Sequence, residues 1–97
     1  MIYVNYLKYS EDRAKVKSLQ PAHNKYLRGV MAQGKLLAAG PFPEWTGGLY
    51  IYEAETAEEA DALMTNDPYA IGGAIESYKI TPWELHGVNL NLFRVTG

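Results

Sequence analysis

The chain has 97 residues, which is enough for one domain, and a domain of this size buries only about two-thirds of the surface that its unfolded chain exposes. With 47% hydrophobic and 21% charged residues, the composition is that of a globular domain and excludes a disordered or collagen-like chain. A formal net charge of -2 without a basic run argues against a nucleic-acid or anionic-membrane surface, so we expect a small neutral or anionic molecule as partner.

The residue inventory also limits the chemistry. There are no cysteines, which removes disulfides, thiolate metal ligands and a cysteine nucleophile, and the two histidines, His23 and His86, lie too far apart in the sequence to indicate a metal site. The N-terminus runs directly into a strand-like segment without a leader pattern, and no apolar run approaches the ~20 residues of a membrane span. We therefore expect a cytoplasmic protein that uses neither a metal nor another cofactor.

The first third of the chain predicts a strand followed by a helix. Residues 2–9 are rich in β-branched and aromatic residues and contain no glycine or proline, which is typical of a strand. Residues 11–20 are charged and indicate no element clearly. Because proline is tolerated in a first helical turn but disrupts a helix interior, Pro21 predicts a helix that starts at or near this position and runs to about Gln33, where Gly34 stops it.

One face of this predicted helix is apolar. His23 shares that face with the side chains at i+3, i+4, i+7 and i+8, which are Tyr26, Leu27, Val30 and Met31. The spacing therefore predicts that His23 lies in the first turn of the helix and points inward.

The next segment predicts a hairpin. Residues 35–42 begin as a short apolar run that Gly40-Pro41 interrupts, which indicates a strand that kinks or ends beside an open site. Gly47-Gly48 then leads into a second run of strand formers, so the whole of residues 35–53 is expected to fold back on itself.

A second helix and a fourth strand complete the pattern. Thr56 and Glu59 have the spacing of a capping box and open a helix with a buried stripe of Ala57, Ala60, Leu63 and Met64. Asn66-Asp67-Pro68 closes this helix, and residues 75–83 alternate as a strand does. The order β-α-β-β-α-β is that of the ferredoxin-like α+β fold, with a four-stranded antiparallel sheet.

The last residues have a pattern of their own. Residues 85–97 continue to alternate, with Val88, Leu90 and Leu92 on one side, and are too apolar for a frayed tail. Since an unpaired apolar strand invites aggregation, we expect this segment to add a strand to a neighbouring sheet edge across a dimer. The chain is thus predicted to divide into a domain at residues 1–84 and a C-terminal extension at residues 85–97.

Three motifs occur in an order and at a spacing that are more specific than any one of them. They are Gln20-Pro21-Ala22-His23, the segment GKLLAAGP at residues 34–41, and Asn66-Asp67-Pro68-Tyr69. Together they resemble the YciI-like family over roughly residues 1–83. The segment between Pro43 and Gly47 is shorter than in many members of that family.

The resemblance implies a fold and a site. It implies a ferredoxin-like domain that packs sheet against sheet with a second copy as a dimeric α/β barrel, with a pocket between the sheet and the helices of each protomer. It also implies an active-site pair, which in this sequence is His23 and Asp67. The family is related to chloro-muconolactone dehydrochlorinases and shares its wider barrel fold with muconolactone isomerases.

His23 and Asp67 each have a functional and a structural interpretation. Imidazole is the side chain whose ordinary pKa lies closest to neutral pH, which makes His23 the best candidate for a catalytic base, while a core histidine bonded to a backbone carbonyl is the alternative. Asp67 immediately precedes Pro68 and is a natural N-cap for the following turn. Capping is compatible with a second role in orienting His23.

The other candidate residues are assigned to substrate binding. Gly40 and Pro41 more often indicate strand-end geometry than ligand contact, although glycine permits close approach and the Gly40 N–H can serve a developing oxyanion. Tyr69 either lines the pocket or packs. The tyrosines of the predicted strands are assigned to sheet packing: Tyr3, Tyr6, Tyr50, Tyr52 and Tyr78.

Two functions are compatible with these residues. The first is a cofactor-independent lyase or isomerase, in which His23 removes a proton from a small lactone-like or oxygenated ring and Asp67 orients it, so that the ring is isomerised or loses HX. The alternative is a non-catalytic module that binds a small molecule or serves as an accessory dimerisation unit. Both predict a homodimer with a small-molecule partner, and neither involves nucleic acid or a membrane.

Overall fold

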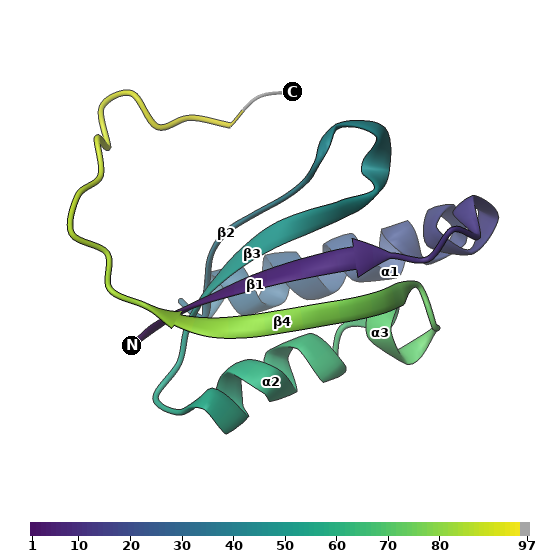
Figure 1. Cartoon of the computed structure of the whole chain (residues 1–97), viewed down its shortest axis with the longest axis horizontal. Coiled ribbons are helices and arrows are strands. Elements are labelled where there is room, and N and C mark those ends of the chain that lie inside the picture. The colour runs from purple at the N-terminus through teal and green to yellow at the C-terminus, as the bar shows by residue number, and fades with distance from the viewer. Residues whose placement is uncertain (96–97) are drawn as a thin grey trace.

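The computed structural model describes residues 1–95 and shows an antiparallel sheet with its helices on one side (Figure 1). The elements are, in chain order, β1 (Ile2–Tyr9), α1 (Arg13–Ala32), β2 (Leu36–Pro41), the 3-10 turn η1 (Pro43–Trp45), β3 (Gly47–Glu53), α2 (Ala57–Thr65), α3 (Pro68–Ile71) and β4 (Ile75–Trp83). The four strands have the spatial order β2-β3-β1-β4, and all neighbours are antiparallel. The predicted ferredoxin-like α+β fold is confirmed.

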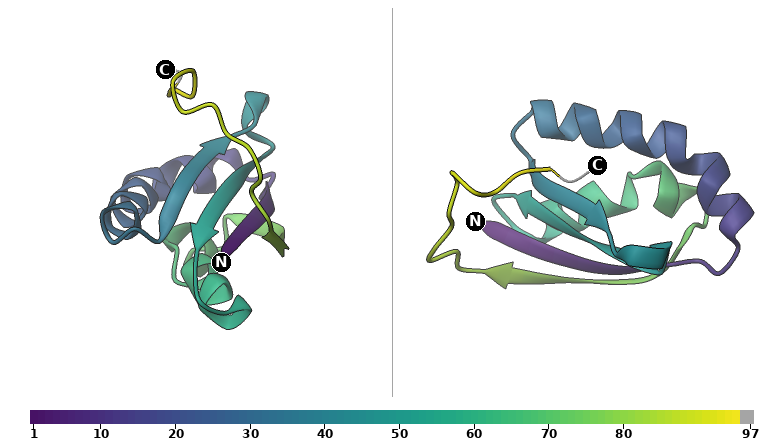
Figure 2. Two further views of the ribbon diagram at one scale, coloured as in Figure 1. Left: turned by 90° about the vertical axis from the view of Figure 1, so that its left-hand side faces the viewer. Right: turned by 90° about the horizontal axis from the view of Figure 1, so that it is seen from above.

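The sheet has one covered and one open face. Along β1 the side chains of Tyr3, Asn5, Leu7 and Tyr9 are buried, while those between them are partly or largely exposed. This period of two is what a strand shows when one face packs on a core and the other is open. Figure 2 shows all three helices on the same side of the sheet. The core therefore lies between the helices and the buried face.

Strand register places two further aromatic side chains on the covered face. Tyr50 of β3 lies opposite Asn5 of β1, and Tyr52 lies opposite Tyr3. Directly paired residues of neighbouring strands point to the same face. Both tyrosines are accordingly among the most deeply buried side chains of the domain.

The predicted start of the first helix is wrong. α1 begins at Arg13, and Asp12 caps it by accepting a hydrogen bond of 3.1 Å from the backbone N–H of Lys15. Pro21 therefore lies inside the helix. Proline removes one helical hydrogen bond, to the carbonyl of Lys17, but both residues are exposed, so this carbonyl can be hydrated. As a consequence His23 lies in the middle of α1 and not in its first turn.

The inward face of α1 is also narrower than predicted. His23 and Val30 are buried and Tyr26 and Leu27 are partly buried, but Met31 is half exposed. A helix that packs on a single sheet buries only a limited stripe, and Met31 falls outside it.

The second helix begins and ends where the sequence indicates. The Thr56 side chain accepts a hydrogen bond of 3.1 Å from the Glu59 N–H, and Asn66 forms the C-cap of α2. Ala60, Leu63 and Met64 are buried, whereas Ala57, in the exposed first turn, is not. Asp67 follows directly as the N-cap of the short helix α3. Within residues 1–95, none of the helices combines the length and the apolar character that a membrane span needs.

Residues 84–95 leave the domain after β4 and contain no strand in the single chain (Figures 1 and 2). Their large apolar side chains are exposed: Leu85, Val88, Leu90, Leu92, Phe93 and Val95. Pairing of this extension with a second chain stays a prediction, and its residues 96 and 97 lie outside the described residues.

Candidate active site

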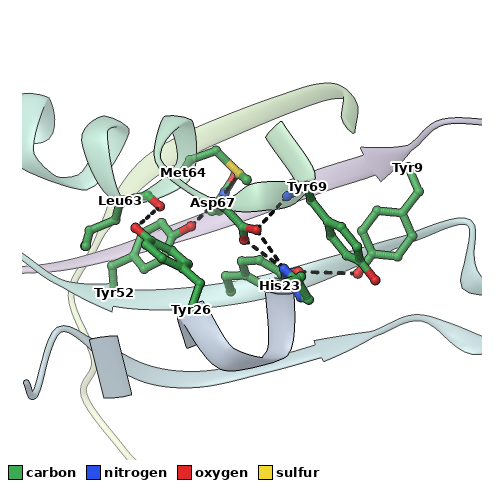
Figure 3. A network of polar contacts seen from close by, with 10 residues as sticks. Tyr9, His23, Tyr26, Tyr52, Leu63, Met64, Asp67 and Tyr69 are labelled. Atoms are coloured by element: carbon green, nitrogen blue, oxygen red, sulfur yellow. Dashed lines mark hydrogen bonds and ion pairs between the residues drawn. The ribbon is translucent and has the colours of Figure 1, made fainter. Parts of the chain in front are cut away.

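His23 and Asp67 meet at the covered face of the sheet (Figure 3). His23 comes from the middle of α1, and Asp67 from the junction between α2 and α3. The imidazole Nδ1 lies 2.8 Å from Oδ1 and 3.0 Å from Oδ2 of the carboxylate. The side chains are only 6% and 1% exposed. The structure thus brings the two predicted residues into direct contact within the core.

Asp67 has a second partner. Its Oδ1 also accepts a hydrogen bond of 2.9 Å from the backbone N–H of Tyr69, so the same carboxylate caps α3 and holds the imidazole. A carboxylate can only accept hydrogen bonds, and this requires the proton of the imidazole on Nδ1. In the neutral ring the other nitrogen, Nε2, is then an acceptor.

A tyrosine hydroxyl forms a hydrogen bond with that second nitrogen. The Tyr50 Oη lies 3.0 Å from Nε2 of His23, and the Tyr9 Oη lies 3.5 Å from the Tyr50 Oη. With Nδ1 protonated, Tyr50 donates to Nε2. The sequence assigned Tyr50 only to sheet packing and gave Tyr9 no role. Strand alternation would have indicated a buried face for both, but only the register between β1 and β3 brings their hydroxyls to the histidine.

Tyr69 fixes the plane of the imidazole. Its ring stacks on that of His23 with 3.7 Å between the centroids and 6° between the planes, and the ring of Tyr9 meets Tyr69 edge-on at 5.6 Å. Such contacts restrict the orientation of an aromatic ring more than area burial alone does. The Tyr69 hydroxyl is buried and has no hydrogen-bond partner among the described residues.

A pocket of about 140 Å³ lies against this cluster. It is lined by Tyr9, His23, Asn24, Leu27, Ala39, Gly40, Pro41, Trp45, Tyr50 and Tyr69. These residues, all in the described part of the chain, include no lysine, arginine, aspartate or glutamate. A cavity of ~150 Å³ accommodates benzene, so this volume corresponds to one small ring.

Four of the five predicted site residues line this pocket, and one does not. His23, Gly40, Pro41 and Tyr69 belong to its wall, whereas Asp67 does not. Asp67 therefore lies behind the imidazole and is not itself part of the pocket wall. Within residues 1–95, no group of three or more histidine, aspartate or glutamate side chains is arranged to hold a metal ion.

Trp45 is a pocket residue that the sequence did not indicate. It lies at the tip of the hairpin between β2 and β3, where Glu44 and Trp45 have φ of 69° and 59° in succession. Left-handed backbone costs a residue with a side chain of order 1–3 kcal/mol and persists where surrounding contacts enforce it. One such contact is the Arg13 guanidinium, which donates to the Trp45 carbonyl. The strained tip thereby places an indole in the pocket wall.

Burial keeps the tyrosines of the site neutral to a higher pH than an exposed tyrosine. Desolvation raises the pKa of Tyr9 and Tyr50 above the ordinary value of 10.0 and raises the pKa of Tyr69 to about 12. Desolvation likewise raises the pKa of Tyr52, further along β3. At neutral pH these hydroxyls are therefore protonated.

These raised pKa values predict how the protein behaves in alkali. The unfolded chain loses its tyrosine protons near pH 10, before the folded state does, so the stability that these four groups contribute is complete below pH 10 and is lost as the pH rises through their folded pKa values. In the native protein, we expect part of the tyrosinate absorbance to develop only at a pH well above 10. In urea-denatured protein all eight tyrosines should ionise together near pH 10. Full ionisation near pH 10 of a still folded protein would contradict this assignment.

Sequence comparison relates the domain to known proteins. The YCII-related domain family matches residues 1–84, which end just after β4. Protein YciI of Escherichia coli O6:H1 is 33% identical over 93 residues, covering 81% of this chain and 95% of that protein. The uncharacterized protein YjpA of Bacillus subtilis is 36% identical over 63 residues, covering 65% of this chain and 73% of its own length.

Two solved structures share the fold. The 5-chloro-2-hydroxyhydroquinone dehydrochlorinase of Burkholderia phenoliruptrix, in complex with 2,5-dihydroxybenzoquinone, has a TM-score of 0.77 and 27% identity, with 90% of this chain and 96% of that chain covered. Muconolactone isomerase has a TM-score of 0.67 over 93% of this chain and 95% of that chain. Its identity is 10%, and this likeness shows the fold alone.

Proposed function

This chain belongs to the YCII-related family, and we propose that it is a cofactor-independent enzyme of lyase or isomerase type that moves a proton on a small oxygenated ring. The observation that carries the proposal is an imidazole in the wall of a ring-sized pocket, held on its far side by a buried carboxylate. The likeness to a dehydrochlorinase that binds a dihydroxybenzoquinone supports it.

In the proposed reaction His23 is the base. Asp67 keeps the proton of the imidazole on Nδ1, so that Nε2 is the nitrogen that gains a proton, and the carboxylate stabilises the imidazolium that forms. Where the halogen stands on a saturated carbon beside the one that loses the proton, the released electron pair forms a ring double bond and expels the halide, which completes the loss of HX. On an aromatic ring the pair first takes a proton at the carbon that bears the halogen, and the halide leaves after a second ring proton is removed. Where the pair takes a proton back at another ring atom and no halide leaves, the reaction is an isomerisation. Gly40, Pro41 and Tyr69 are the proposed contacts of the ring.

The catalytic role of His23 is tested by turnover. We expect His23→Ala to lower kcat/KM at least about 100-fold with 5-chloro-2-hydroxyhydroquinone or a muconolactone, because general bases contribute 10²–10⁴-fold. His86→Ala is the matched control, since His86 is exposed and does not line the pocket. Equal rates for the wild type and His23→Ala would rule out His23 as the base. A compound that raises Tm but is never consumed would favour the binding module.

We also propose that the open face of the sheet pairs with a second copy of the chain. This face carries an apolar groove of about 350 Å³ whose wall includes Val4, Leu49, Ile51 and Trp83. Val4 and Ile51 lie directly opposite each other on β1 and β3, at the centre of the sheet. A domain of this size gains stability from covering such a face.

Light scattering coupled to size-exclusion chromatography tests this assembly. We expect a dimer for the wild type and a monomer for Ile51→Asp, because a carboxylate at the centre of an apolar interface is desolvated without a partner. Lys25→Asp, on the exposed side of α1, is the control and should remain dimeric. A monomeric wild type, or a dimeric Ile51→Asp, would contradict the proposal.

A further inference from the structure

Both nitrogens of His23 are already engaged. Nδ1 bonds to Asp67, and Nε2 accepts from Tyr50 at 3.0 Å. The stacked ring of Tyr69 covers one face of the imidazole. A molecule in the pocket therefore finds no free nitrogen on the base, and the proton must reach Nε2 by another route.

The hydroxyl that blocks Nε2 belongs to a pocket residue. Tyr50 lines the pocket together with Tyr9, and the two Oη atoms are 3.5 Å apart. Both side chains are buried, at 1% and 3% exposure, so their hydroxyls are shielded from bulk water. The hydrogen bonds join four polar groups into one series, in the order Tyr9, Tyr50, His23 and Asp67, and the first three of them line the pocket.

We propose that Tyr50 is the catalytic group that meets the substrate, and that it takes a proton from a hydroxyl of a neutral hydroxylated ring while it passes its own proton to His23. This inference rests on the proposed function and names the substrate class of the same site. The substrate O–H bond breaks as a new Tyr50 O–H bond forms, and the original Tyr50 O–H bond breaks as Nε2–H forms. The ring oxygen keeps the electron pair, and the imidazolium is left beside the Asp67 carboxylate.

The chemistry of the site favours a ring hydroxyl over a carbon acid. A hydroxyl donates a strong hydrogen bond to the Tyr50 oxygen and is held in line for transfer, whereas a C–H group is not. Because burial raises the pKa of Tyr50, its hydroxyl stays protonated and is no base on its own. It transfers a proton only together with His23.

The pocket wall also selects the charge and size of the ring. The wall contains no lysine or arginine to pair with a carboxylate, and its polar groups are chiefly hydroxyls and an imidazole. Its volume of about 140 Å³ suits one ring. The Tyr9 hydroxyl lies close enough to Tyr50 to bond a second oxygen on the same ring. Hydroxylated rings without a carboxylate are the class that fits these groups.

Tyr52 offers a matched control. It lies two residues beyond Tyr50 on β3, is equally buried and points to the same face, but its hydroxyl accepts from Asn5 at 3.2 Å and it does not line the pocket. Removing either hydroxyl costs one buried hydrogen bond, so the two variants lose stability in the same way. Thermal unfolding of Tyr50→Phe and Tyr52→Phe verifies that both variants are folded at the assay temperature.

The first experiment measures turnover of 5-chloro-2-hydroxyhydroquinone. We expect Tyr50→Phe to lower kcat at least about 100-fold, as the loss of a general acid–base group does, and Tyr52→Phe to remain within about threefold of the wild type. A proton inventory in H2O and D2O mixtures should be curved for the wild type, because two protons move together. If Tyr50→Phe keeps the kcat of the wild type, the proton relay through Tyr50 is overturned. If His23→Ala is inactive in the same assay, the proposed function still stands, but without the relay.

The second experiment measures binding and needs no turnover. By isothermal titration calorimetry with hydroquinone, we expect Tyr50→Phe to weaken Kd about fivefold to tenfold, the value of one hydrogen bond, and Tyr52→Phe to leave it unchanged. 2,5-Dihydroxybenzoate should bind more weakly than hydroquinone to the wild type. Equal Kd values for the two variants would overturn the proposed contact between the ring and Tyr50. This result can be read even if the wild type turns over no substrate, an outcome that would refute the proposed reaction separately.

Discussion

The hydrogen bond between His23 and Asp67 is the constraint on which the rest of the site depends. A carboxylate that is 1% exposed must be compensated by donors, and Asp67 finds them in the imidazole and in the first free N–H of α3. The bond joins the middle of α1 to the junction of α2 and α3, 44 residues away. It also fixes which imidazole nitrogen carries the proton, and hence which one faces β3.

The sheet supplies the other half of the arrangement. Alternation along β1 and β3 turns Tyr9 and Tyr50 toward the helices, and the antiparallel register brings their hydroxyls together beside His23. Tyr69 closes one side by stacking, and Trp45 reaches the pocket from a hairpin tip with two left-handed residues. Strain at such a tip is retained where the neighbouring contacts outweigh it. The covered face of the sheet and the left-handed hairpin tip thus both contribute residues to the wall of one small pocket.

Much of this could be predicted from the sequence, for identifiable reasons. Strand alternation, the Thr56 cap and the glycine-bounded hairpin depend on local chemistry, and each appears where expected. Helical spacing alone predicts that His23 points toward the core. The start of α1 did not follow, because Pro21 lies inside the helix on its exposed side, where water can bond the Lys17 carbonyl that has lost its helical partner. Tyr50 and Trp45 were missed because their roles depend on strand register and on a left-handed turn, which local propensity does not encode.

The most direct test of this account is nitrogen NMR of the histidine side chains. In 15N-labelled protein at a pH where the imidazole is neutral, His23 should be the Nδ1–H tautomer with an unprotonated Nε2 that accepts from Tyr50, and Asp67→Asn should disturb this tautomer. The exposed His86 provides the internal reference. An Nε2–H tautomer for His23 in the wild type would contradict the account. Nδ1 would then have no proton to donate to Asp67, and Nε2 could not accept a proton from Tyr50.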